Sequence, residues 1–257
     1  MREKSILLFL CALAGMFVSS CGLEEVITVE EPVTTYNNPL YSSTDYLTWY
    51  CNFKTSSDTG DYFTGTDIYY KIYNNYSNLN SQRSSILAVN TTSNGSAAAT
   101  RLIETYTYQQ LGASKKTGNA VYFPEVGQSV VFRVKTYTYA DTTVDPDSDS
   151  TYHTSHACVG VKETNATTYT YADYIPYRNG NSKSFDFFDD DDDDDEGTRD
   201  VEPVEGDADY YYSSTASADD TYYVQFFAVG VAFDSSSVSN SYSLVLDLGS
   251  VPIIKGE

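Results

Sequence analysis

Few side chains of this chain could do acid–base or metal chemistry, and they lie close together. His153 and His156 are the only histidines, three residues apart, and Cys158 follows two residues later. Imidazoles act as general bases and zinc ligands, and a thiolate can join them in a metal site. Their spacing matches no established zinc pattern, and the chain lacks Gly-x-Ser-x-Gly, His-Glu-x-x-His and phosphate-binding glycine motifs. We therefore predict no catalytic residues, no metal site and no cofactor.

The carboxylates are concentrated in one segment. Residues 186–209 hold fourteen acids against the single base Arg199. Oxygen ligands suit calcium, but a selective site needs spaced ligands held by a defined turn, and adjacent like charges repel each other. Residues 145–156 begin like a calcium loop, yet Ser150 and His156 stand where that loop needs Gly and Glu. We predict a disordered acidic loop over 186–209 and a surface turn after residue 145.

The N-terminus has the layout of an export signal. Arg2 and Lys4 form a basic start, residues 6–18 an apolar run, and two serines precede Cys21. These are the three parts of a secretory signal peptide, and the run is too short to remain as a spanning helix. A cysteine directly after the small residues resembles the lipobox of bacterial lipoproteins, although Val18 and Ser20 replace the usual Leu and Gly or Ala. The resemblance implies cleavage after residue 20 and lipid attachment at Cys21.

Two simpler interpretations of the same segment stay open. One is an ordinary secretory signal with an incidental cysteine, and the other is an uncleaved N-terminal anchor. Each buried methylene of an acyl chain contributes about 0.8 kcal/mol, so several chains on Cys21 would hold the protein firmly to a membrane. The membrane, through this lipid, is the first predicted partner.

Composition excludes one class of partner and favours one class of fold. The formal net charge is −21 and becomes −22 without residues 1–20, so the protein repels nucleic acid. Its 25 tyrosines, with many Ser, Thr and Asn, favour strands over helices. About 237 mature residues are enough for one large domain. We predict residues 21–38 as a flexible acidic tether and 39–257 as a single domain, with order beginning near residue 39.

Alternating apolar residues mark the strands. Period-two patterns cover residues 47–53, 68–72, 130–134, 222–233 and 242–248. One apolar face per strand is typical of antiparallel sheets that pack face to face. The fold class is therefore an all-β antiparallel β-sandwich.

Four of these segments resemble strands of the fibronectin type III domain. Residues 47–49 are similar to its second strand with the core Trp, and 63–70 to the entry of its third strand. Residues 222–228 resemble the Tyr-x-Val-x-Val-x-Ala of the penultimate strand, and 241–249 the last. The resemblance implies a fibronectin type III-like or immunoglobulin-like sandwich. Residues 74–220 depart from it, because the family joins its third and penultimate strands by a short connection.

The long insertion has its own features. Residues 81–89 and 97–111 favour short helices, because they lack helix breakers. Phe185, Phe187 and Phe188 are expected to fix the start of the acidic loop to the sandwich. 

Several tyrosines share strand faces with charged residues. Tyr69 and Tyr73 alternate with Lys71 on one face, and Tyr137 and Tyr139 with Arg133 and Lys135 on another. Charged neighbours predict that these faces meet water, where tyrosines suit recognition, as Tyr169 and Tyr171 would too. Cross-strand packing of Tyr and Thr is the alternative.

Cys51 and Cys158 are the two cysteines that survive maturation without a lipid. Export permits a disulfide between them. Cys51 is expected on the inward face of its strand, whereas Cys158 shares a face with His156 and Gly160. If these faces differ, the alternative is two separate buried or half-buried thiols.

The predicted function is a lipid-anchored cell-envelope protein that displays a β-sandwich binding or structural module for a protein or glycan ligand. The alternative is an envelope-associated enzyme or a carbohydrate-handling lipoprotein with an aromatic cleft. Glu24 and Glu25 resemble the acidic surface-export signal of Bacteroidetes lipoproteins. This implies the outer membrane rather than the inner one, with surface exposure.

Overall fold

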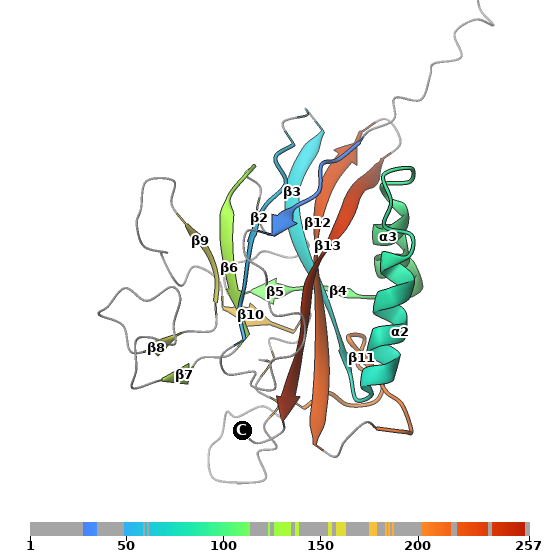
Figure 1. The fold of residues 1–257 in the computed structure, drawn as a ribbon, viewed down its shortest axis with the longest axis vertical. Helices are drawn as coiled ribbons and strands as arrows, with labels where there is room; N and C mark the ends of the chain where they lie inside the picture. Colours follow the sequence, from blue (N-terminus) through green and yellow to red (C-terminus); the bar gives the residue numbers. More distant parts are fainter. Residues whose placement is uncertain are drawn as a thin grey trace, which may run out of the picture.

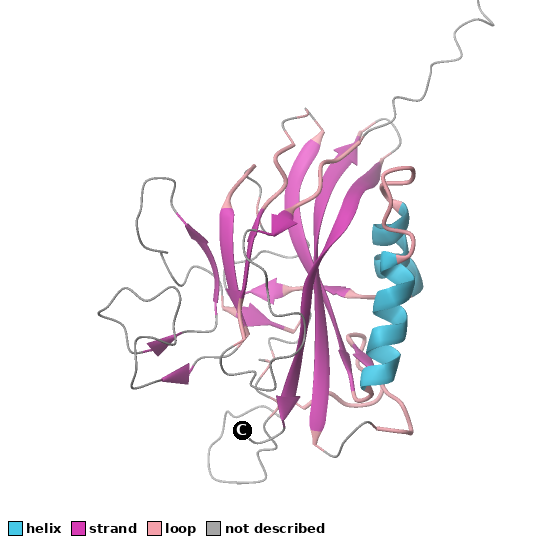
Figure 2. Ribbon diagram, viewed as in Figure 1, coloured by secondary structure: helices cyan, strands magenta, loops and turns pink. Residues whose placement is uncertain are grey.

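The protein folds into three layers: a smaller sheet, a larger sheet and a helical layer (Figure 1). The computed structural model describes residues 28–34, 49–58, 60, 62–113, 123, 126–134, 137–138, 154–155, 158–162, 175–178, 183, 185, 187, 202–216, 220–235 and 238–254. In these ranges the chain is mostly antiparallel strand, which confirms the predicted all-β sandwich (Figure 2).

The smaller sheet has four strands. In order across the sheet they are β1 (Val33–Thr34), β2 (Cys51–Lys54), β6 (Ser129–Arg133) and β9 (Cys158–Lys162). All its pairings are antiparallel. Trp49, Cys51 and Phe53 are buried, as the alternation of residues 47–53 predicts.

The larger sheet is the centre of the molecule. Its strands, in order, are β11 (Tyr210–Tyr211), β3 (Phe63–Tyr73), β12 (Thr221–Asp234) and β13 (Ser239–Ile254), with β4 (Gln109–Gln110) on the free edge of β3. β12 and β13 form a long antiparallel hairpin that bulges at Gly230 and near Leu248. Two short pairs complete the strands: β5 (Gly112–Ala113) with β10 (Pro176–Tyr177), and β7 (Tyr137–Thr138) with β8 (Thr154–Ser155).

The helices cover the outer face of the larger sheet (Figure 1). They are α2 (Tyr76–Leu87), α3 (Ala97–Thr100) and the π-helical turn η1 (Arg101–Thr105) that continues α3. Asn75 begins α2, and its side chain accepts a hydrogen bond from the backbone N–H of Asn78. Both predicted helices exist, but the first starts before residue 81 and the second ends at Thr105. No helix in the described ranges is long and apolar enough to span a membrane.

Aromatic rings fill the space between the two sheets. Phe226 on β12 lies at the centre, with its ring centroid 4.8 Å from Phe132, 5.5 Å from Trp49 and 5.8 Å from Phe185. Phe187 is also buried, so the predicted role of this phenylalanine pair at the start of the acidic loop is confirmed. The third member, Phe188, lies outside the described residues.

The opposite face of the larger sheet is buried as well, which corrects one prediction. Tyr69, Lys71 and Tyr73 do not meet water; they are 9 %, 5 % and 0 % exposed beneath the helical layer. Arg133 is buried too, and its guanidinium lies over the ring of Tyr50. Cross-strand packing, the alternative interpretation, applies to these residues. When both faces of a sheet are covered, the side chains on either face are buried. Tyr139, Tyr169 and Tyr171 lie outside the described residues, as does the side chain of Tyr137.

The strand order agrees with the immunoglobulin arrangement only in part. The third, penultimate and last predicted strands are neighbours, as β3, β12 and β13. In the immunoglobulin sheet the strand beside the second one follows the edge strand in sequence. Here β6 beside β2 precedes the edge strand β9. The fibronectin type III likeness therefore stays a prediction.

Two predicted boundaries differ from the structure. Residues 28–34, which fall in the predicted tether, are packed on the sheets and include β1, so order begins before residue 39. We call residues 28–34 the strap. At the end of the predicted acidic loop, residues 202–209 are folded, and Asp209 is buried. The rest of the loop apart from Phe187, and the remainder of the tether, lie outside the described residues.

Candidate functional site

The residues singled out for chemistry do not assemble into a site. Cys21, His153 and His156 lie outside the described residues. Cys51 lies opposite Phe132 on β6, whereas Cys158 pairs with the next residue, Arg133. The side chain of Cys158 lies outside the described part, so the disulfide stays a prediction. Within the described ranges, no three His, Cys, Asp or Glu side chains gather as a metal site would require.

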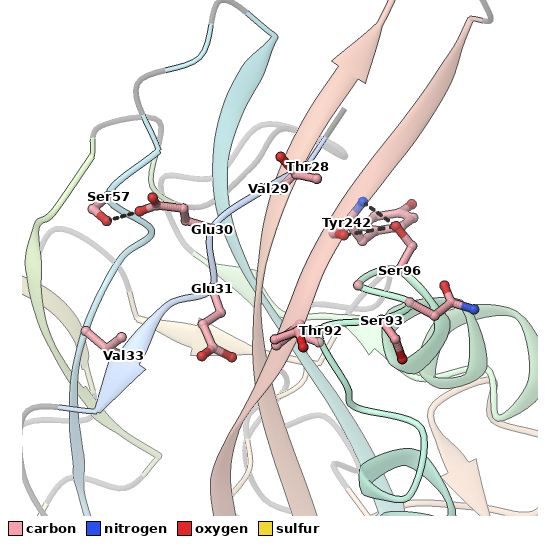
Figure 3. A pocket seen from close by; sticks show the side chains of 13 residues that line it. Thr28, Val29, Glu30, Glu31, Val33, Ser57, Thr92, Ser93, Ser96 and Tyr242 are labelled. Atoms are coloured by element: carbon pink, nitrogen blue, oxygen red, sulfur yellow. Dashed lines mark hydrogen bonds between the residues drawn. The ribbon is translucent and has the colours of Figure 1, made fainter. Parts of the chain in front are cut away.

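A pocket of about 590 Å³ lies between the strap, the loop that joins α2 to α3, and β13 (Figure 3). Three walls form it. Residues 28–31 and Val33 of the strap make one wall, together with Ser57. Residues 92–96 make the second wall, and Tyr242 and Leu244 on β13 make the third. Small-molecule sites have volumes of about 300–1,000 Å³, so the pocket has the size of a ligand site.

The strap is held against β12 by a close backbone contact. At Gly230 a Cβ atom would lie 2.9 Å from the carbonyl oxygen of Glu30 and 3.1 Å from Cγ1 of Val29. Only glycine permits this approach. The backbone N–H of Gly230 donates to Oγ of Ser243 at 2.8 Å, so the bulge keeps its hydrogen bond. The strap that crosses β12 therefore explains why a glycine, Gly230, stands in the middle of a buried strand.

Polar contacts of Glu30 and the pairing of β1 tie the strap to the smaller sheet and the segment that follows β2. The hydroxyl of Ser57 donates to the carboxylate of Glu30, and the backbone N–H of Glu30 donates to Asp58 at 3.3 Å. Pro32 is buried, and the pairing of Val33 with Lys54 begins β1. The wall is thus attached to both sheets.

The loop wall is fastened to the outer edge of β13. Asn90 donates from its amide to the carbonyl of Val245 and accepts from the N–H of Val245, both at 2.9 Å. The hydroxyl of Ser96 donates to the carbonyl of Tyr242 at 3.0 Å. These side chains replace a neighbouring strand at an edge that would otherwise expose unpaired backbone groups. All three walls are therefore fixed without a ligand.

The lining is rich in hydrogen-bond acceptors and carries negative charge. Glu30 and Glu31 supply carboxylates, and most of the other lining residues carry hydroxyl or amide groups. None of the described lining residues is basic. Figure 3 shows the carboxylate of Glu30 turned toward Ser57 and that of Glu31 pointing away from it. In the described part of the chain, no donor contacts the carboxylate of Glu31.

A second group of charges surrounds Arg178 and is structural: Arg178 and Asp209 are buried, and Asp207 is half-buried. Its guanidinium contacts both oxygens of Asp209, at 2.7 and 2.8 Å, and Asp207 at 2.6 Å. The hydroxyl of Tyr70 donates to Asp209 at 2.7 Å. Burial opposes the charge of Asp207, but hydrogen bonds from Arg178 and from the N–H of Val204 hold its pKa below the usual value. These contacts join Arg178 to the end of the acidic segment and hold that end in place. The cluster therefore has a structural role.

Lys71 is a further buried ionisable group. Its ammonium donates to the carbonyl of Tyr106, at the end of η1, and to Oγ1 of Thr107 at 3.1 Å. A cation at this position satisfies the C-terminal carbonyls of a helix. Desolvation lowers the pKa of Lys71 to about 8. With 5 % exposure it anchors the helical layer and offers no open site.

The chain stands apart from the proteins with which we compared it. No family model, no curated protein and no solved structure matches it. The pocket and the N-terminal sequence are therefore the features from which a function can be inferred.

Sequence reasoning missed this pocket. Residues 28–31 have no strand period and carry two acids before Pro32, a composition typical of a linker. The one available signal was Gly230, a glycine inside an apolar strand, which often marks a close approach of another backbone. The approaching segment lies two hundred residues away in sequence, so the glycine alone does not identify which segment contacts it.

Proposed function

We propose that this chain is a lipid-anchored cell-envelope protein whose β-sandwich is a binding module, with the pocket beside the strap as its ligand site. The single observation that carries the binding role is a polar pocket whose three walls are fixed before any ligand arrives. Preorganised walls reduce the entropy that a ligand loses on binding.

The anchor is proposed from the N-terminal sequence. The lipobox resemblance at Cys21 supports acylation, and Glu24 and Glu25 support display at the outer membrane. Mass spectrometry of the N-terminal peptide tests the lipid, and protease treatment of intact cells tests the exposure. Cys21→Ser should release the protein into the aqueous phase, and unchanged membrane retention would contradict the anchor.

The pocket is tested by blocking it. Ligand-observed NMR with a panel of oligosaccharides and short peptides detects binding to the full mature chain. Ser93→Trp places an indole on the loop wall and should abolish binding. Ser84→Trp, on the exposed side of α2 away from the pocket, is the matched control and should leave binding unchanged. Equal binding by both variants would contradict the pocket as the site.

A further inference from the structure

We infer that the pocket beside the strap takes a ligand that carries an ammonium or guanidinium group, such as a lysine or arginine side chain or an amino sugar. This inference rests on the proposed function and names the chemistry of its ligand. It starts from the unequal roles of the two adjacent carboxylates in the strap.

Glu30 and Glu31 differ in what they contact. The carboxylate of Glu30 accepts a hydrogen bond from Ser57, and this bond helps to hold the strap in place. Glu31 lines the same pocket, and within the described ranges no hydrogen-bond donor or cation contacts it. Glu31 is also exposed to solvent, so its carboxylate is available to a ligand that enters the pocket. Hydrogen bonds between ionised partners are about twice as strong as neutral ones.

The surroundings add acceptors and negative potential. Asp58 lies directly behind the strap and accepts from the backbone of Glu30. The hydroxyls of Thr92 and Ser93 line the opposite wall and can accept from an ammonium group. An acidic cavity with partly apolar walls concentrates the field and attracts cations. The same field repels phosphates, sulfates and uronic acids.

The cavity is large enough for more than a simple ion. A volume of about 590 Å³ accommodates a monosaccharide or a lysine side chain with its flanking peptide bonds. Leu244 and Val33 offer apolar contact to the carbon skeleton of such a ligand. The ligand class is therefore an organic cation with hydrogen-bonding groups.

Paired probes test the charge directly. Isothermal titration at low salt compares glucosamine with N-acetylglucosamine, and a lysine-containing tripeptide with its Nε-acetylated form, on the full mature chain. We expect the cationic member of at least one pair to bind at least tenfold more tightly. The pair that shows the difference identifies the source of the cation. Because exposed charges are screened by salt, 300 mM NaCl should weaken that binding.

Variants locate the effect. Glu31→Gln should weaken binding of the cation at least tenfold. Glu104→Gln removes an exposed acid from η1, away from the pocket, and should change it less than twofold. If neutral probes bind as tightly as cationic ones, or if Glu31→Gln has no effect, the inference fails while the pocket remains a binding site. If no probe of either kind binds, the inference fails. The proposed binding function fails with it only if the wider NMR panel also shows no binding that Ser93→Trp removes.

Discussion

The two faces of the larger sheet are buried by different means. On the side of the smaller sheet, Phe226 is surrounded by other rings, and the contacts are those of an aromatic core. On the helical side, Phe227 meets Tyr108, and hydroxyls and charges accompany the rings. Tyr73, on this side, donates its hydroxyl hydrogen to Oε1 of Gln82 at 2.8 Å, and its hydroxyl oxygen lies 3.0 Å from that of Tyr108. One sheet therefore combines a face stabilised by packing with a face whose polar groups must also find partners.

The polar chain on the helical side continues to the edge of the sheet. Arg83 on α2 donates to Asp247 on β13, and Gln225 on β12 donates to the same carboxylate at 2.8 Å. Because hydrogen bonds require defined distances and angles, these contacts fix how the helices sit on the strands. We therefore expect the sandwich side to contribute more to stability and the helical side to determine where the helices lie on the sheet.

Truncation of the two neighbouring phenylalanines gives the largest expected effects. Phe226→Ala should lower the free energy of unfolding by about 3–5 kcal/mol, the usual cost of removing a buried aromatic ring. Phe227→Ala should cost about 1 kcal/mol less, because fewer ring contacts are lost. Urea denaturation measures both, with the exposed Phe233→Ala as a control that changes little. A larger loss of unfolding free energy for Phe227→Ala would show that the helical side contributes more to stability than the sandwich side.

The charged cluster around Arg178, on the sandwich side, should be nearly as sensitive. Arg178→Met leaves the buried carboxylate of Asp209 without its cation and should cost about 3–5 kcal/mol. The double variant Arg178→Met with Asp209→Leu should recover part of this loss, because the unpaired charge is gone. Urea denaturation of both proteins measures the difference. No recovery would mean that the guanidinium acts through its packing rather than its charge.

The contact of Asn90 with β13 tests the importance of polar partners on the helical side. Asn90→Ala removes both hydrogen bonds to Val245 and should cost about 1–3 kcal/mol. The amide of Val245 should then exchange its hydrogen faster than in the unaltered protein. Asn94→Ala, in the exposed part of the same loop, is the control and should change stability by less than about 0.5 kcal/mol. Equal effects would show that the loop, not the edge of β13, determines the result.

Lys71 gives the smallest effect and a distinct pH dependence. Its pKa is about 8 in the folded protein against an ordinary value of 10.5. Between these values the unfolded chain binds more protons, so the free energy of unfolding rises with pH. Burial raises the pKa of Tyr69, Tyr73 and Tyr108, so these tyrosines should not ionise in the folded protein below about pH 10.

We expect a gain of about 1–2 kcal/mol between pH 8 and pH 9.5 in the unaltered protein relative to Lys71→Met. Denaturation curves at closely spaced pH values measure it. Parallel stability curves for the two proteins would contradict a desolvated lysine at this position.

The sequence predicted what depends on local period and missed what depends on distant segments. The long runs of β12 and β13 alternate clearly, and both strands lie where expected. On β3 the alternation is equally clear, but it does not show whether the second face is exposed to solvent or covered by helices. Lys71 suggested an exposed face, yet this face is the covered one. The strap has no period at all, and its place is set by Gly230 and Ser57 far along the chain.

The early start of the folded chain limits how far the domain can stand from its anchor. Thr28 is the first described residue and follows Cys21 by seven positions. Even fully extended, seven residues reach about 25 Å. With acyl chains on Cys21, the first residue of the strap, and with it one wall of the pocket, would stay within about 25 Å of the lipid surface. A ligand tethered to the same membrane surface would then be within reach of the pocket.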